Sequence, residues 1–138
     1  MPTSYRRGQR SSLVIVGLGI DLVENGRVTQ ELARGDWRQE NGVFTSEEIR
    51  RCSTGRNPAL LYAACFAAKE ATLKALGVGV SDLAMFREVE IGLDENGEYA
   101  VILHDRLKSE SEQLGVRHIR VSVAAAAKQT GAMVILES

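Results

Sequence analysis

The sequence predicts an α+β fold in which a mostly antiparallel sheet packs against one long central helix. Residues 59–76 supply the helix, because they are rich in alanine, leucine, lysine and glutamate and contain no glycine or proline. Short apolar runs of strand character lie near both ends of the chain, and Asn96-Gly97 predicts a tight hairpin between two of them. The predicted order, β α α α β β α β β, is an α+β arrangement.

The first element is a buried strand. Residues 13–20 are apolar and rich in β-branched side chains, and we expect the strand to end at Asp21. Apolar positions then recur with roughly helical spacing over residues 23–34, so a helix follows. Gly35 is placed to close that helix.

The next two helices carry clear boundary signals. Thr45 precedes a short helix and Glu48 lies three residues later, which is the pattern of a reciprocal capping box. Asn57-Pro58 opens the long helix over residues 59–76, and Gly77 ends it.

The second half of the chain predicts mainly strands. Residues 83–93 are compatible with a strand, residues 94–97 form the turn, and residues 99–103 return as its partner. Residues 105–114 read as a helix that Gly115 caps. The last two predicted strands are residues 118–123 and 132–136.

Length and charge limit the class of protein. A chain of 138 residues with 44% hydrophobic and 25% charged residues fits one globular domain, which we expect over residues 13–138 behind a disordered tail of residues 1–12. A net charge of −1 gives no overall field to attract nucleic acid or an anionic membrane. No apolar run reaches the roughly 20 residues that span a bilayer. We therefore expect a cytoplasmic protein with no nucleic-acid or membrane partner.

Asp21 is the first candidate for chemistry. A carboxylate directly after a buried strand can project into a cleft and bind a hard cation such as magnesium through oxygen. The same residue type is also common as the N-cap of the helix that follows. Position in the sequence leaves these two interpretations of Asp21 open.

Glu70 and Lys74 are the second candidates. They lie four residues apart on the long helix, so they share a face with Phe66 one turn earlier. A surface ion pair is the simpler interpretation of such spacing, and it stabilises a helix by only about 0.3–0.5 kcal/mol. Lys69 points elsewhere on the helix, and we expect solvent around its ammonium group.

Five consecutive motifs give these single residues a context. GLGIDLVENGRV, FTSEEIRRC, CFAAKEATLKALGVG, FREVEI and DENGEYAVIL follow one another between residues 17 and 103. In order and spacing the chain resembles the holo-acyl-carrier-protein synthase family, the small single-domain 4'-phosphopantetheinyl transferases. The resemblance runs over residues 13–137 and implies the fold of that family.

The resemblance implies a reaction and a site. Members of the family transfer 4'-phosphopantetheine from coenzyme A to a serine of an apo acyl carrier protein, with Mg2+. On this resemblance Asp21 and Glu70 match the magnesium ligands, and Glu70 and Lys74 match the catalytic residues. It further implies that Lys74, Lys69 and Gly77 contact coenzyme A.

The resemblance also implies two kinds of protein contact. Arg27 matches an arginine that faces the acidic helix of the carrier protein, so the side of the molecule that carries Arg27 and Arg34 is the expected docking surface. Members of the family form homotrimers with active sites between subunits, and the same is expected of this chain.

Two segments depart from the family's pattern. Ala124, Ala125 and Ala126 replace a Ser-His-Thr type sequence, and Cys65 replaces a basic residue. Both positions are expected, on the resemblance, to contact coenzyme A. Two alternatives to the transferase therefore stand beside it: a relative that binds carrier protein without catalysis, and an enzyme that acts on a carrier-tethered biosynthetic intermediate.

Overall fold

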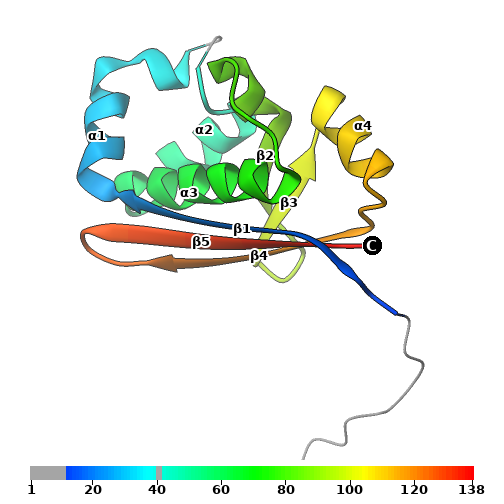
Figure 1. Cartoon of the computed structure of the whole chain (residues 1–138). Helices are drawn as coiled ribbons and strands as arrows, with labels where there is room; N and C mark the ends of the chain where they lie inside the picture. The colour runs from blue at the N-terminus through cyan, green and yellow to red at the C-terminus, as the bar shows by residue number, and fades with distance from the viewer. Residues whose placement is uncertain (1–11, 40–41) are drawn as a thin grey trace, which may run out of the picture.

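Figure 1 shows the computed structural model of the chain, which describes residues 12–39 and 42–138. Helices gather on one side of a sheet, and the longest of them runs along that sheet. The elements follow one another as β1 (Ile15–Glu24), α1 (Asn25–Arg34), the 3-10 helix η1 (Asp36–Arg38), α2 (Ser46–Ser53), α3 (Pro58–Leu76), the 3-10 helix η2 (Leu83–Glu88), β2 (Val89–Leu93), β3 (Tyr99–Leu103), α4 (Asp105–Gln113), β4 (His118–Ala125) and β5 (Gln129–Glu137).

The strands form two antiparallel sheets. The larger one has the order β1-β5-β4, and the smaller one is the hairpin of β2 and β3. The α+β prediction is confirmed, and so is the predicted order of the elements. The tail predicted for residues 1–12 falls, apart from Ser12, outside the described residues, and the division into a tail and one domain stays a prediction.

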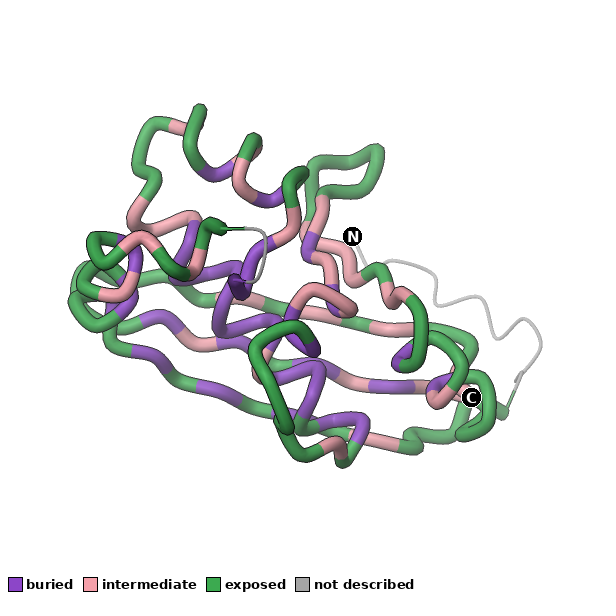
Figure 2. The backbone as a smooth tube through the Cα atoms, turned by 90° about the horizontal axis from the view of Figure 1, so that it is seen from above, coloured by how far each residue is buried: buried purple, intermediate pink, exposed green. Residues whose placement is uncertain are grey.

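The central helix α3 is buried on nearly all sides. It packs on the inner face of the large sheet, with α1 and α2 against its other flanks (Figure 1). Burial alternates along β5, where every second residue from Thr130 to Leu136 is buried, and Figure 2 shows this as a change of colour along the tube. Alternation of this kind identifies a strand with one face on the core.

Several boundary predictions are confirmed by the local hydrogen bonds. Thr45 Oγ1 accepts from the Glu48 amide at 3.2 Å and the Glu48 carboxylate accepts from the Thr45 amide at 2.8 Å, which completes the capping box. Gly35 and Gly77 adopt the left-handed conformation that ends a helix, with φ of 89° and 70°.

Several strand boundaries were predicted wrongly. The last two strands, predicted over 118–123 and 132–136, are longer and span His118–Ala125 and Gln129–Glu137. The first strand does not end at Asp21 but pairs with β5 as far as Glu24, so its predicted range of 13–20 is too short. The predicted strand over residues 83–93 is half 3-10 helix, because Asp82 Oδ1 caps the Met85 amide at 3.1 Å and only the part from Val89 onward pairs.

The contact of α3 with β1 is unusually close, and two glycines permit it. A Cβ atom on Gly19 would lie 1.9 Å from the Ala71 carbonyl oxygen, and one on Gly17 would lie 2.3 Å from that of Ala75. The glycines of the Gly17-Leu18-Gly19 segment therefore serve helix–sheet packing. They bring the backbone of β1 under the helix at the residues just before Asp21.

We predict that Gly19→Ala lowers the free energy of unfolding by about 3 kcal/mol, because the added methyl group overlaps backbone atoms that cannot rotate away. Urea denaturation measures the change. Gly79→Ala is the matched control, since a Cβ at Gly79 meets nothing within 4 Å. Equal stability of the two variants would contradict this role for Gly19.

Candidate functional site

Two carboxylates meet where β1 passes under α3. Asp21 faces inward from β1 and is only 7% exposed, while Glu70 is half-buried on α3. Both line one pocket of about 440 Å³. The two interpretations of Asp21 can now be separated: the N-cap of α1 is Glu24, so the capping interpretation of Asp21 is wrong.

Lys74 reaches the same place from one turn further along α3. Its Nζ donates to Asp21 Oδ1 at 2.8 Å and to the Ile20 carbonyl at 3.2 Å. The hydrogen bond to Asp21 raises the pKa of Lys74, so the ammonium group stays charged. Its side chain is 56% exposed, so its charge is accessible to a ligand that approaches Asp21. Lys74 was expected to pair with Glu70 within α3, but it forms its ion pair with Asp21 of β1.

Glu70 is held in an environment that disfavours its charge. Burial raises the pKa of Glu70 to about 7, and the neighbouring Asp21 carboxylate adds to the rise, while Lys74 opposes it. A carboxyl group with a pKa near neutrality can exchange a proton at physiological pH.

The second Asp21 oxygen suggests a cation. Oδ2 is buried and has no hydrogen-bond partner within the described residues, which is costly for a carboxylate. A hard cation held by Asp21 and Glu70 would satisfy this oxygen and offset the two like charges. No cluster of three or more His, Cys, Asp or Glu side chains suited to a metal occurs in residues 12–39 and 42–138. A magnesium ion held by these two carboxylates would take its remaining ligands from water and substrate, as this ion usually does in proteins.

The pocket has an aromatic wall that sequence reasoning missed. The Trp37 ring lies 4.5 Å from that of Phe66, centroid to centroid, and both rings line the pocket with Arg27. The Val43 and Phe44 amides donate to the Trp37 carbonyl at 2.9 and 3.2 Å, which fixes η1 beside the site. The one signal for it in the sequence is that Trp37 is the only tryptophan of the chain.

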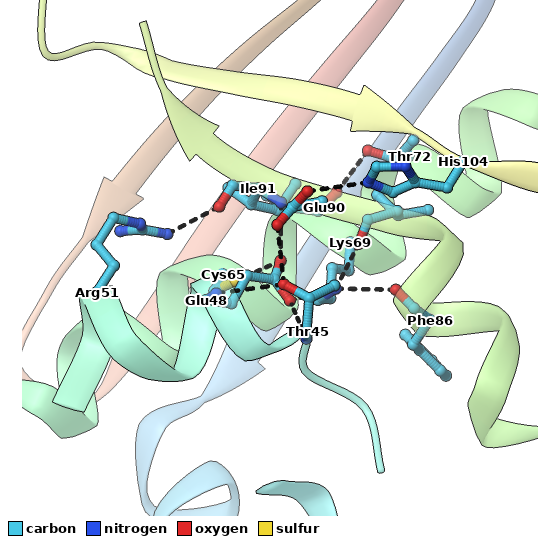
Figure 3. A network of polar contacts seen from close by, with 12 residues as sticks. Thr45, Glu48, Arg51, Cys65, Lys69, Thr72, Phe86, Glu90, Ile91 and His104 are labelled. Carbon is cyan, nitrogen blue, oxygen red and sulfur yellow. Dashed lines mark hydrogen bonds and ion pairs between the residues drawn. The ribbon is translucent and has the colours of Figure 1, made fainter. Parts of the chain in front are cut away.

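Lys69 corrects one expectation. Its side chain is fully buried instead of solvated, and Nζ lies 2.7 Å from Glu48 Oε1. Nζ also donates to the carbonyls of Phe86, at 2.8 Å, and of Val89 (Figure 3). With its ammonium group enclosed in this way, Lys69 offers no surface to coenzyme A.

Glu48 is the centre of that network. Besides Lys69, its carboxylate accepts from the Ile91 amide at 2.7 Å and from the Cys65 thiol at 3.1 Å (Figure 3). Burial raises the pKa of Cys65, which keeps the thiol protonated as a donor. Cys65 is therefore a buried side chain, and the expectation that its position faces a ligand is wrong for this chain.

The alanine run ends β4, with Ala124 and Ala125, and continues into the turn between β4 and β5. Ala124 to Ala127 are exposed, and the turn borders a second pocket of about 590 Å³. The lining residues of this pocket are Glu24, Gly26, Ala127, Lys128 and Gln129. Glu24 lines both pockets, so the second pocket adjoins the carboxylate site.

Three other predicted site residues lie at different distances from the carboxylates. Arg27 lines the first pocket. Arg34 is two helical turns further along α1, where it is exposed and pairs with Glu31 at 3.2 Å. Gly77 ends α3, the helix that carries Glu70, and does not line either pocket.

The sequence matches a known family over most of its length. The family model described as the 4'-phosphopantetheinyl transferase superfamily matches residues 17–128. The chain therefore belongs to this superfamily.

Individual relatives point to one family within it. The chain is 35% identical over 124 residues to a holo-acyl-carrier-protein synthase of Koribacter versatilis, covering 90% of this chain and 99% of the relative. It is 36% identical over 124 residues to one of Syntrophus aciditrophicus, covering 90% and 97%. The resemblance to the holo-acyl-carrier-protein synthase family is confirmed.

Solved structures agree with the fold. The crystal structure of the holo-acyl-carrier-protein synthase from Neisseria meningitidis superposes with a TM-score of 0.80 at 27% identity, covering 91% of this chain and 100% of that one. The synthase from Bacillus anthracis, solved in complex with coenzyme A (3',5'-ADP), has a TM-score of 0.69 at 27% identity and covers 90% and 97%.

We predict that Glu70 makes stability depend on pH. Since its pKa rises from 4.5 to about 7 on folding, the folded state binds more protons between these values, and the free energy of unfolding falls as the pH rises through them. Glu70→Gln flattens this slope, and Glu95→Gln in an exposed turn is the control. Urea denaturation across the pH range measures the slope, and an NMR titration that places Glu70 near pH 4.5 would refute the prediction.

Proposed function

We propose that the chain transfers the 4'-phosphopantetheine group of coenzyme A to a serine hydroxyl of an apo acyl carrier protein, with Mg2+ bound by Asp21 and Glu70. One observation carries the proposal: Asp21 of β1 and Glu70 of α3 line one pocket, Lys74 of α3 donates to Asp21, and the other Asp21 oxygen lacks a partner among the described residues. The family to which the chain belongs supports the same activity.

The reaction forms one bond and breaks another. The serine oxygen of the carrier bonds to the phosphorus that bears pantetheine, and the bond from that phosphorus to the bridging oxygen breaks. Adenosine 3',5'-bisphosphate leaves with the electron pair. Bound magnesium would offset the negative charge that develops on the phosphate oxygens.

Glu70 and Lys74 have separate roles in the proposed reaction. We assign Glu70 as the group that accepts the serine proton, because its ionised carboxylate can act as a general base. A bound cation would lower the pKa of Glu70, so the ionised form would dominate in the loaded enzyme. Lys74, held by Asp21, presents a charged donor to the phosphates.

We predict that Asp21→Asn and Glu70→Gln each reduce the rate of carrier loading by at least about 100-fold. Both changes keep the side-chain shape and remove one carboxylate charge. Mass spectrometry of the carrier measures loading. Glu95→Gln is the control, since Glu95 is exposed in the turn between β2 and β3 and lies outside the proposed site. Loading at the wild-type rate by either site variant would overturn the assigned roles.

The carrier protein is proposed to dock on the side of α1 that carries Arg27 and Arg34. Arg27 lines the carboxylate pocket, and Arg34 lies seven residues later, on the same side of the helix. An acidic helix laid along this side would meet both guanidinium groups and deliver its serine to the pocket.

We predict that Arg27→Glu raises KM for the carrier about tenfold or more while kcat for the bound carrier changes little. The effect should shrink at high salt, because exposed charges are screened. Lys108→Glu on α4 is the control, since α4 lies away from α1 (Figure 1). An unchanged KM for the carrier would exclude this docking surface.

A homotrimer is proposed from the outer face of the large sheet. Four outward side chains of β1 are apolar and at least 40% exposed: Val16, Leu18, Ile20 and Leu22. Met133 of β5 adds to them, so an apolar face of this size is suited to contact with further copies of the chain.

We predict that wild-type protein sediments as a trimer and that Leu18→Asp sediments as a monomer, because a buried unpaired carboxylate disfavours the interface. Val80→Asp is the control, since Val80 is exposed to a similar degree in a loop outside the sheet. Analytical ultracentrifugation measures the three masses, and a monomeric wild type would refute the trimer.

A cytoplasmic location is also proposed. Both cysteines, Cys52 and Cys65, are free thiols, which suits a reducing compartment. Cell fractionation tests it, and recovery outside the cytoplasm would refute it. None of the helices in the described part of the chain combines the length and apolar character needed to cross a membrane.

A further inference from the structure

Asn25 makes several polar contacts, although the proposed reaction assigns it no role. It is the first residue of α1 and is 9% exposed. Its Nδ2 donates to the Ala126 carbonyl at 2.7 Å and to that of Ala127 at 3.2 Å. Its Oδ1 accepts from Thr130 Oγ1 at 2.7 Å. Both side-chain hydrogens and the side-chain oxygen of Asn25 are thus used.

These contacts join segments that are far apart in the sequence. The start of α1 and the turn between β4 and β5 lie at the same end of the sheet (Figure 1). The Asn25 amide also donates to the Lys128 carbonyl at 2.9 Å, and the turn closes on itself with Ala126 N donating to Gln129 O at 3.0 Å. Thr130 is fully buried, so the attachment is anchored in the core.

The turn that Asn25 holds is one wall of the second pocket. Ala127, Lys128 and Gln129 line that pocket with Glu24 and Gly26, and Glu24 also lines the carboxylate pocket. Because the second pocket adjoins the carboxylate pocket at Glu24, it is the hollow into which the nucleotide half of coenzyme A can extend when the phosphates lie at Asp21 and Glu70. Lys128 gives this hollow a cation suited to phosphate.

Because the alanine run has no polar side chains, ligand binding at the turn depends on where the turn backbone lies. Ala124 to Ala127 offer no side-chain donor, so this stretch can contact a ligand only through its backbone and its methyl groups. A backbone donor acts only if its position is fixed, and here the position depends on Asn25 and Thr130.

We infer that Asn25 is a positioning residue for coenzyme A: with Thr130 it fixes the β4–β5 turn as the wall against which the nucleotide half of the donor binds. This inference rests on the proposed transferase function. It assigns no contact with substrate to Asn25 itself, which acts through the turn.

The test separates donor binding from general stability. Asn25→Ala and Thr130→Val are expected to raise KM for coenzyme A by about 10- to 100-fold, because a displacement of about 1 Å has effects of that order. KM for the carrier and kcat at saturating coenzyme A should stay near wild type. Thr130→Ser keeps the hydroxyl group and should retain the wild-type KM.

Thr29→Val is the matched control. Its hydroxyl donates to the Asn25 carbonyl at 3.1 Å on the same helix and, within the described part of the chain, makes no hydrogen bond to the turn. If Asn25→Ala does not fold, Thr130→Val with its serine counterpart still decides the question. Hydrogen exchange of residues 126–130 in the free protein gives a second readout, and it should accelerate in Asn25→Ala.

The outcomes are distinct. A raised KM for coenzyme A together with faster exchange of the turn supports the inference. Faster exchange with an unchanged KM overturns it, because the turn would then be held by Asn25 without forming part of the donor site. Unchanged exchange overturns it as well. If wild-type protein neither binds coenzyme A nor loads the carrier, the proposed function fails first and takes the inference with it.

Discussion

The close contact between α3 and β1 is the constraint on which the rest of the structure depends. Because Gly17 and Gly19 lack side chains, the backbone of α3 can approach the backbone of β1 closely. This approach puts Asp21, two residues after Gly19, within reach of Lys74 and beside Glu70. The carboxylate site is therefore a product of steric fit. A wider gap between α3 and β1 would move Asp21 away from Glu70 and Lys74, even though the site residues themselves stayed the same.

The opposite flank of α3 is fixed by a buried ion pair. Lys69 and Glu48 join α3 to α2, to η2 and, through the Ile91 amide, to β2. Buried charges are costly unless every partner is present, and here the partners come from four elements (Figure 3). Such a network specifies one arrangement of α3 relative to the β2–β3 hairpin. Lys69, the residue before Glu70, therefore fixes α3 on the flank opposite the carboxylate site.

The sequence was informative where local rules apply. Caps at Thr45 and Gly77, the Asn96-Gly97 hairpin and the long helix follow from nearest-neighbour chemistry, and all are present. Pairing of β1 beyond Asp21, burial of Lys69 and the aromatic wall at Trp37 depend on segments distant in the sequence. Asn25 was missed for the same reason, since its partners lie about 100 residues away.

The position of Trp37 gives the protein an intrinsic optical reporter. The indole is the only one in the chain, and it lies against Phe66 on the wall of the carboxylate pocket. Tryptophan emission responds to the polarity around the ring, so any molecule that displaces water from this pocket alters the fluorescence of the whole protein. Occupancy of the site can thus be followed without a label, in a chain that has no second indole to obscure the signal.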